Sequence, residues 1–201
     1  MTGDPMVHVI DDDDAARDAL TFLLSSANFL VRAYESANAF LNDIPTTVAG
    51  CVITDVRMPE ISGLELLRRL KAREIDWPVI VITGQADVPV AIEAIKSGAV
   101  DFIEKPYDAE VMLGAVKFAL DRQANAAREA QRAEIQRKLA ALSSHERQVL
   151  QFLAEGRVNS SIARDLGLNI RTIEVHRASV MEKMQATNLS HLVRMMLLAA
   201  P

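Results

Sequence analysis

The stretch that decides the fold is MVHVIDDDDAARDALTFLLSS, which runs from Met6 to Ser26. An apolar run, Met6–Ile10, leads directly into four consecutive aspartates, and the amphipathic pattern Ala15–Ser26 follows. This order is typical of a buried strand that is followed by a surface helix. Four adjacent carboxylates repel one another and raise one another's pKa, so they need compensating partners. The sequence alone leaves open whether the run is a solvated turn, a helix N-terminus, a cation site, or several of these.

The strand-then-helix unit repeats along the first 120 residues. The expected strands are Met6–Ile10, Leu30–Tyr34, Cys51–Thr54, Val79–Thr83 and Asp101–Glu104. The expected helices are Ala15–Ser26, Ser36–Leu41, Ser62–Arg73, Val88–Ser97 and Ala109–Leu120. Five such units predict an α/β fold in which a doubly wound, flavodoxin-like (βα)5 parallel sheet is covered by helices on both faces.

The composition changes after this region. The stretch 121–139, DRQANAAREAQRAEIQRKL, contains no Gly or Pro and consists mostly of strong helix formers. It predicts a helical linker or an extension of the preceding helix, and its weak apolar row leaves coiled-coil pairing as a further alternative. Four helical patterns without a strand then predict a small all-α domain: Ser144–Ala154, Asn159–Leu166, Ile170–Met184 and Leu189–Ala200. The expected domains are therefore 5–121 and 139–200, joined by a helical linker at 122–138.

The charge of the chain is unevenly placed. Residues 1–122 carry 20 acidic and 11 basic side chains, net −9, whereas residues 123–201 carry 7 and 11, net +4. This asymmetry indicates two modules with different partners. The single cysteine, Cys51, excludes an internal disulfide framework. No run approaches the ~20 apolar residues that cross a bilayer, and the N-terminus lacks a secretory signal pattern. We expect a soluble cytoplasmic protein that does not bind membranes.

The expected strands carry reactive side chains at their carboxyl ends, which is where ligands bind in parallel α/β sheets. Asp11 and Asp12 follow the first strand, Asp55 follows the third, Thr83 ends the fourth, and Lys105 follows the fifth. Three carboxylates, a hydroxyl and an ammonium group should therefore meet at one edge of the sheet. Carboxylate oxygens suit Mg²⁺. With the metal present, Lys105 and Thr83 can help to stabilise a phosphoryl group.

This constellation resembles the receiver domain of bacterial two-component response regulators, and the resemblance covers residues 5–122. The matching segments are VIDDDD (9–14), ITDVRMPEISGLELL (53–67), VIVITG (79–84) and AVDFIEKP (99–106). The resemblance implies that Asp55 accepts a phosphoryl group from a sensor histidine kinase. It also implies that Asp11 and Asp12 hold Mg²⁺ together with Asp55 and the backbone carbonyl of Arg57.

The same resemblance assigns roles to residues near the fifth strand. Thr83 and Lys105 match the hydroxyl and the lysine of the family site, and Phe102 matches its aromatic rotamer switch. The Lys105–Pro106 peptide bond is expected to be cis. On phosphorylation, the surface around the fourth helix is expected to form a homodimer. The expected dimer residues are Val88, Val90, Ala91, Glu93, Ala94 and Lys96.

The basic module has the pattern of a helix-turn-helix, in which a short helix, a turn at Gly167 and a longer helix, Ile170–Met184, follow one another. At 100° per residue, Ile173, His176, Val180 and Met184 share one face of the longer helix and should be buried. The opposite face is the candidate for the major groove of DNA. The expected DNA-binding residues are Asn159, Ser160, Arg171, Thr172, Glu174, Val175, Arg177, Ala178, Glu182 and Lys183.

These side chains suggest specific contacts. Val175 and Ala178 suit thymine methyl groups, Glu174 suits cytosine N4, and Arg171 suits guanine or phosphate. Arg177 and Lys183 lie at the edges of the apolar face, where they can extend to phosphates. A four-helix module for protein interaction is the alternative.

The module resembles the LuxR-type DNA-binding domain over roughly residues 139–200. The family often has Arg where His145 stands and Lys where Ser160 stands, so affinity is expected to depend more on dimerisation. His176 is expected to be a packed histidine rather than a metal ligand.

The order of receiver, helical linker and LuxR-type module is that of the NarL/FixJ class of response regulators, and several segments resemble the FixJ branch. That branch controls nitrogen-fixation genes in rhizobia under an oxygen-responsive kinase. The resemblance implies a transcription activator that binds promoter DNA and RNA polymerase and is not an enzyme. Two alternatives are a haloacid-dehalogenase-like phosphatase, with Asp11-Asp12-Asp13 as its D-x-D motif, and a constitutive DNA-binding protein with a degenerate receiver.

Overall fold

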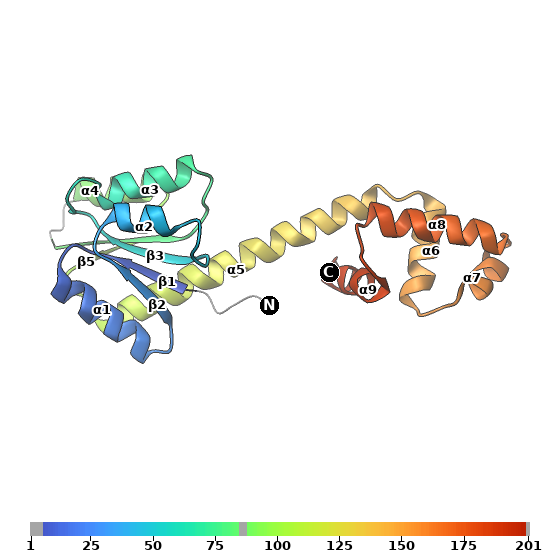
Figure 1. Cartoon of the computed structure of the whole chain (residues 1–201), viewed down its shortest axis with the longest axis horizontal. Helices are drawn as coiled ribbons and strands as arrows, with labels where there is room; N and C mark the ends of the chain where they lie inside the picture. Colours follow the sequence, from blue (N-terminus) through green and yellow to red (C-terminus); the bar gives the residue numbers. More distant parts are fainter. Residues whose placement is uncertain (1–5, 85–87, 200–201) are drawn as a thin grey trace. The chain divides into compact units, whose positions relative to one another are not determined.

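The computed structural model describes residues 6–84 and 88–199, which form two compact units that divide between Asn125 and Ala126 (Figure 1). In the first unit, strands and helices alternate: β1 Met6–Ile10, α1 Asp14–Ser26, β2 Leu30–Tyr34, α2 Ala37–Asp43, β3 Gly50–Asp55, α3 Gly63–Ala72, β4 Val79–Thr83, α4 Val88–Lys96, β5 Asp101–Glu104 and α5 Ala109–Ala140. The second unit contains α6 Ser144–Ala154, α7 Asn159–Leu166, α8 Ile170–Lys183 and α9 Leu189–Ala199.

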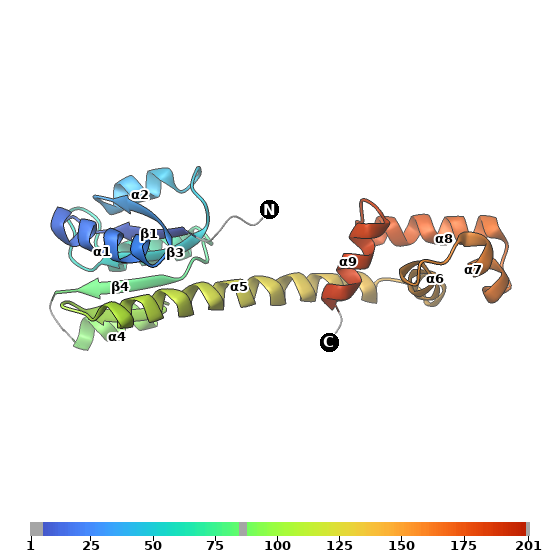
Figure 2. The same cartoon turned by 90° about the horizontal axis from the view of Figure 1, so that it is seen from below.

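The first unit is built on a five-stranded parallel sheet with the strand order β2-β1-β3-β4-β5. Helices α1 and α5 cover one face, and α2, α3 and α4 cover the other (Figures 1 and 2). Successive strand residues serve the two cores in turn, since Val7 and Val9 pack toward α1 and α5 whereas Ile10 packs toward α2 and α3. The predicted doubly wound α/β fold is confirmed.

Most element boundaries match the prediction, and two helices start one residue later than expected for the same reason. Ser36 and Ser62, expected as first helical residues, are N-caps whose hydroxyl oxygens accept hydrogen bonds from Ala39 and Glu65 backbone N–H groups. Such residues stay outside the helix because their side chains replace the missing backbone partners. Strand β3 extends to Asp55, which is therefore the last strand residue.

Helix α5 continues through the segment expected as a linker. Near its start, Met112 and Val116 are buried against the sheet, and near its end Ile135 is buried in the core of the second unit. The alternative of an extended helix is therefore confirmed. Ile135 lies within the expected linker at 122–138 and belongs to the second core, and the expected domain bounds stay a prediction. Within residues 6–84 and 88–199, neither α5 nor any other helix combines the length and apolarity needed to cross a membrane.

The second unit packs α6, α7, α8, α9 and the end of α5 around one apolar core. The turn between α7 and α8 depends on Gly167, which ends α7 with φ 65° and ψ 26°, a left-handed conformation that favours glycine. Asn169 then caps α8 by accepting a hydrogen bond from the Arg171 N–H. This is the helix, turn and longer helix that the sequence predicts. Ala200, the expected last residue of α9, lies outside the described residues.

Candidate functional site

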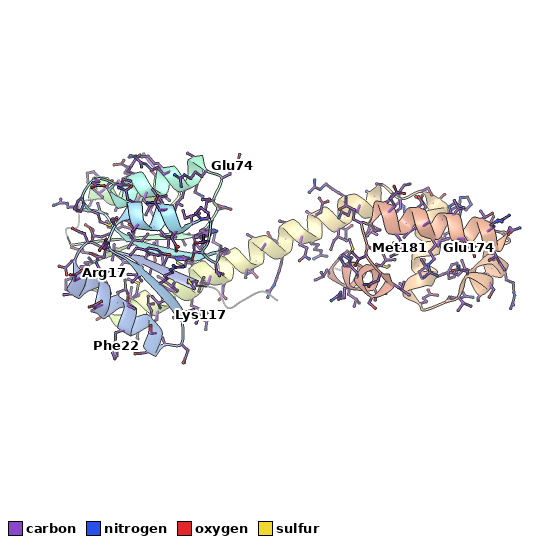
Figure 3. All side chains as sticks on the ribbon, viewed as in Figure 1. Arg17, Phe22, Glu74, Lys117, Glu174 and Met181 are labelled. Carbon is purple, nitrogen blue, oxygen red and sulfur yellow. The ribbon has the colours of Figure 1, made fainter. Side chains whose placement is uncertain are left out.

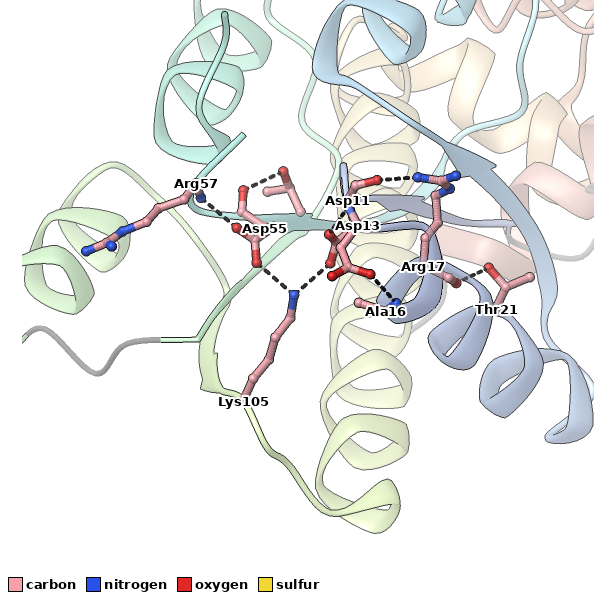
Figure 4. Close-up of polar contacts among 9 residues, drawn as sticks. Asp11, Asp13, Ala16, Arg17, Thr21, Asp55, Arg57 and Lys105 are labelled. Carbon is pink, nitrogen blue, oxygen red and sulfur yellow. Dashed lines mark hydrogen bonds and ion pairs between the residues drawn. The ribbon is translucent and has the colours of Figure 1, made fainter. Parts of the chain in front are cut away.

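Two buried acids and a lysine meet at the carboxyl edge of the sheet (Figure 4). Asp11 follows β1 and is 2 % exposed, and Asp55 ends β3 and is 8 % exposed. The Lys105 Nζ donates to Asp11 Oδ2 at 2.7 Å and to Asp55 Oδ1 at 2.8 Å. Three of the predicted site residues, which come from three different strand ends, are therefore in direct contact.

The two carboxylates are also held from the backbone. Asp11 Oδ1 accepts a hydrogen bond from the Asp13 N–H at 3.0 Å, and Asp55 Oδ2 accepts one from the Arg57 N–H at 2.6 Å. Helix α3 begins close to Asp55, because a Cβ atom on Gly63 would lie 2.2 Å from the Asp55 carbonyl oxygen. A glycine is therefore required at the start of α3. Each acid is fixed at both oxygens before any ligand binds.

Lys105 offsets part of the negative charge of this pair of acids. Burial by itself would lower the pKa of Lys105, but its hydrogen bonds and charge interactions with Asp11 and Asp55 outweigh burial and raise the pKa. The Lys105 N–H donates to the Thr83 carbonyl oxygen at 2.7 Å, which places Thr83, 2 % exposed, at the same edge. The Lys105–Pro106 peptide bond is cis, as the resemblance implies.

The four consecutive aspartates have four different surroundings. Asp11 binds Lys105, and Asp13 caps α1 by accepting from the Ala16 N–H at 3.0 Å, which lowers the pKa of Asp13. Asp14 forms an ion pair with Arg17. Asp12 is exposed, and among the described residues its carboxylate has no hydrogen-bond or ion-pair partner. The run is therefore a helix N-terminus and part of a buried charge cluster at once, and Asp12 is the acid left for a ligand.

The oxygen donors at this edge fit a magnesium ion. Mg²⁺ is usually bound by one or two carboxylates and keeps several waters. Asp11 and Asp55 supply two buried carboxylates at the required edge, and Asp12 follows directly. Over residues 6–84 and 88–199, no group of three acidic, histidine or cysteine side chains is arranged to hold a metal. Asp11, Asp12 and Asp55 therefore do not form such a group in this structure, although two carboxylates with water fit the ion, and the expected set of three stays a prediction. Arg57 lies beside Asp55, and the role of its carbonyl stays a prediction.

Phe102 lies on β5, which is separated by β4 from β3 and its last residue, Asp55. Its ring is half-buried against the core on the α2–α4 side of the sheet, and its N–H donates to Asp101 Oδ1 at 2.8 Å. This position is compatible with the predicted rotamer switch, which stays a prediction.

The outer face of α8 carries exposed side chains in the predicted order. Arg171, Glu174, Val175, Ala178 and Glu182 are exposed; Glu174 is labelled in Figure 3. On the opposite face Ile173, Val180 and Met184 are fully buried. His176 is half-buried and stacks on the ring of His145, with ring centroids 5.7 Å apart and planes inclined by 9°. The helix therefore presents one polar and one packed face, as the sequence predicts.

Two residues expected to contact phosphates already have partners. The Arg177 Nη1 donates to Asn159 Oδ1 at 3.2 Å, which joins α8 to the first residue of α7. The Lys183 Nζ donates to both carboxylate oxygens of Glu146, at 2.9 and 2.7 Å. The amide of Asn159 is neutral, so it does not compensate the positive charge of Arg177. The charge of Lys183 is neutralised by the Glu146 carboxylate. Ser160 is exposed and Thr172 half-buried.

Glu146, which the sequence interpretation missed, organises this unit. It is 5 % exposed and accepts hydrogen bonds from the Ser143 N–H at 2.7 Å and the Ser179 Oγ at 2.6 Å, besides Lys183. The hydrogen bonds from Lys183, Ser179 and Ser143 lower the pKa of Glu146 to about 2. Glu146 thereby ties the start of α6 to α8. The pattern Ser-x-x-Glu at 143–146 is a capping-box signal that could have identified its local role.

Comparisons with known proteins find a known family for each of the two domains. Residues 7–117 match the family of response regulator receiver domains, and residues 140–196 match the bacterial regulatory proteins of the luxR family. The transcriptional regulatory protein FixJ of Azorhizobium caulinodans is 53 % identical over 194 residues, which cover 96 % of this chain and 92 % of that protein. The chain belongs to the FixJ-type response regulators.

A solved structure supports the assignment of both domains. Full-length FixJ from B. japonicum is 47 % identical to this response regulator, with a TM-score of 0.59, and the match covers 99 % of this chain and 98 % of that one. The family consists of phosphorylation-regulated transcription regulators, with a receiver that implies a sensor kinase and a LuxR-type domain that implies DNA binding. The phosphatase alternative is therefore dropped. A 40 % identical relative, DctR of Rhodobacter capsulatus, is a C4-dicarboxylate transport transcriptional regulatory protein.

Helix α4 carries the residues of the expected dimer surface, which stays a prediction. Val88, Glu93 and Lys96 are exposed, and Val90 and Ala91 are half-buried. Ala94 is fully buried and so is not part of the exposed surface, because it lies one turn after Val90 on the helix side that faces the sheet. Two further residues of α4 are exposed, Ile92 at 49 % and Ile95 at 52 %. With Val88 they form an apolar row along the outer side of α4, which we call the α4 stripe.

Proposed function

We propose that this response regulator accepts a phosphoryl group on Asp55 from a sensor histidine kinase, with Mg²⁺ held by Asp11, Asp12 and Asp55. The observation that carries the proposal is the contact of one ammonium group, Lys105 Nζ, with two buried carboxylates at the carboxyl edge of the sheet. The bound ion supplies positive charge to the incoming phosphoryl oxygens. The assembled cluster argues against a degenerate receiver.

The chain's own groups account for the transfer. A carboxylate oxygen of Asp55 forms the O–P bond as the N–P bond to the kinase histidine breaks, and the product is an acyl phosphate. The Arg57 N–H holds Asp55 in position for attack, because it fixes one carboxylate oxygen at 2.6 Å. Lys105 then offsets the added negative charge, and the Thr83 hydroxyl turns toward the phosphate. Phe102 takes up the space that Thr83 leaves.

The output is dimerisation and DNA binding. The α4 stripe (Val88, Ile92, Ile95) becomes self-complementary, and two copies join as a homodimer. Two linked α8 helices then bind two half-sites of a promoter, which raises affinity without new contacts. The regulator acts as an activator that engages RNA polymerase. Nitrogen-fixation genes are the target class, supported by the similarity to FixJ from A. caulinodans.

Labelling with radioactive acetyl phosphate and Mg²⁺ tests the acceptor. The wild-type chain is expected to form an acyl phosphate that hydroxylamine cleaves and that maps to Asp55, whereas Asp55→Asn forms none. Asp12→Asn is expected to need far more Mg²⁺. The matched control is Asp13→Asn, which removes a charge from the same run but keeps a side chain that caps α1. Equal labelling of wild type and Asp55→Asn would contradict the proposal.

A further inference from the structure

Arg17 lies beside the acidic run, and its side chain is more enclosed than its place on a surface helix suggests. The side chain is 15 % exposed. Its Nη1 donates to the backbone carbonyl oxygen of Asp11 at 2.7 Å, and its Nη2 pairs with the Asp14 carboxylate. Figure 4 shows the guanidinium reaching from α1 to the carbonyl of Asp11. One planar group thus joins the helix to the end of β1.

This contact completes the fixation of Asp11. The carboxylate of Asp11 accepts from the Asp13 N–H and from Lys105 Nζ, and its carbonyl accepts from Arg17. The side-chain carboxylate and the backbone carbonyl of Asp11 are therefore both held in place. The guanidinium of Arg17 also pairs with the Asp14 carboxylate, and Asp14 therefore does not compete with Asp12 for a cation.

We propose that Arg17 is a positioning residue of the phosphorylation site. By holding the Asp11 carbonyl, it sets the place of the Asp11 carboxylate for Mg²⁺ and hence for acceptance of a phosphoryl group. This inference rests on the proposed function.

The loss of the Arg17 charge and the loss of its contact with Asp11 predict opposite changes in the affinity for Mg²⁺. Loss of a positive charge leaves the acidic edge more negative, so charge alone would raise its affinity for Mg²⁺. Loss of the support behind Asp11 lets the carboxylate move, and partners behind metal ligands contribute about tenfold or more in metal affinity. Arg17→Lys separates the two, because it keeps the charge but lacks the fork that bonds a carbonyl and a carboxylate together.

The test measures Mg²⁺ binding to the full chain by isothermal titration calorimetry. Both Arg17→Lys and Arg17→Met are expected to raise the Kd for Mg²⁺, by about tenfold. In acetyl phosphate labelling, the half-saturating Mg²⁺ concentration should rise by the same factor, while the rate at saturating Mg²⁺ stays close to that of wild type. A general loss of folding would lower that rate instead.

Two control variants complete the design. Asp14→Asn removes the surface ion pair but leaves the contact between Arg17 and the Asp11 carbonyl, so its Kd should stay close to that of wild type. Arg32→Met removes an arginine of β2 that pairs with Asp43, the last residue of α2, and should also bind Mg²⁺ normally. Repeating the titrations at high salt screens the charge effect and leaves the positioning effect.

Three results would overturn the inference. They are tighter binding by Arg17→Met with normal binding by Arg17→Lys, normal binding by both, or a lower saturating rate with an unchanged Mg²⁺ requirement. If wild type itself bound no Mg²⁺, the proposed function would fail as well, and this outcome is distinct from failure of the Arg17 variants alone.

Discussion

At the scale of single residues, Lys105 makes two buried acids compatible. Asp11 and Asp55 are 2 % and 8 % exposed and share its ammonium group. Lys105→Met leaves them facing each other without a cation, and breaking such a pair destabilises a protein by roughly 3 kcal/mol. The variant should therefore unfold at a lower temperature in EDTA, and saturating Mg²⁺ should raise its Tm by more than it raises that of wild type.

Differential scanning calorimetry with and without Mg²⁺ measures both effects of Lys105→Met. Lys71→Met is the matched control, because Lys71 forms an exposed ion pair with Asp76 on the same domain. If Mg²⁺ raised the Tm of Lys105→Met and of wild type by the same amount, the Lys105 ammonium group would not compensate the carboxylates that Mg²⁺ compensates.

Glu146 makes the stability of the DNA-binding domain depend on pH. Its pKa in the folded chain is about 2, below the ordinary value of 4.5. The carboxylate therefore stabilises the fold fully above about pH 5, and this contribution is lost as the pH falls toward 2. Glu146→Gln should lower stability at neutral pH and remove most of the pH dependence of this domain between pH 5 and 2.

The receiver provides an internal control for the Glu146 experiment. Trp77 is the single tryptophan and stacks on His8 in the receiver, so its fluorescence reports only that domain. Urea unfolding followed by circular dichroism should shift in Glu146→Gln, while the Trp77 transition stays in place. Glu155→Gln, at an exposed acid after the same helix, should change neither transition. A shifted Trp77 transition would contradict a role confined to the second unit.

At the scale of elements, α4 has two unlike sides. Ala94 and Val90 pack on the core, and the α4 stripe is exposed. Ile92→Glu puts a charge in the centre of that stripe, and desolvating it at an interface without a partner is unfavourable. The variant should accept the phosphoryl group normally but stay monomeric, which sedimentation velocity before and after phosphorylation measures.

Phe22→Glu is the control for the α4 stripe. Phe22 is 75 % exposed on α1, and Figure 3 shows its place on that helix. It carries the same kind of change on a different surface, so its dimerisation should equal that of wild type. Dimers of phosphorylated Ile92→Glu, or their loss in Phe22→Glu, would place the interface elsewhere.

At the scale of the whole molecule, binding to DNA depends on which charges remain available. Arg177 is held by a neutral amide, whereas Lys183 is neutralised by Glu146. On an operator found by footprinting genomic DNA with the phosphorylated chain, Arg177→Ala should reduce the slope of log K against log salt by about 0.9 per subunit. Lys183→Ala should leave that slope unchanged and lower the stability of the domain. Equal changes of slope would show that DNA draws Lys183 away from Glu146.

The sequence predicted the features that depend on local pattern. Strands appear within about one or two residues of their expected ends because apolar runs and strand burial coincide here, and Lys105 meets Asp11 and Asp55 because parallel strands end at one edge. It did not predict contacts that only the folded chain creates. The buried pair of Glu146 and Lys183 needs two packed helices, and the Arg17 contact with the Asp11 carbonyl needs the helix phase relative to the strand.

The length of the acidic run determines how α1 is oriented relative to β1. Arg17 reaches the Asp11 carbonyl because six positions separate the two residues, with α1 starting at Asp14. Each residue turns a helix by about 100°. Deleting one of the four aspartates would therefore rotate α1 and move Arg17 away from β1, even though three aspartates remain. A substitution within the run changes the contacts of one aspartate, whereas a change in its length also displaces Arg17 from the Asp11 carbonyl.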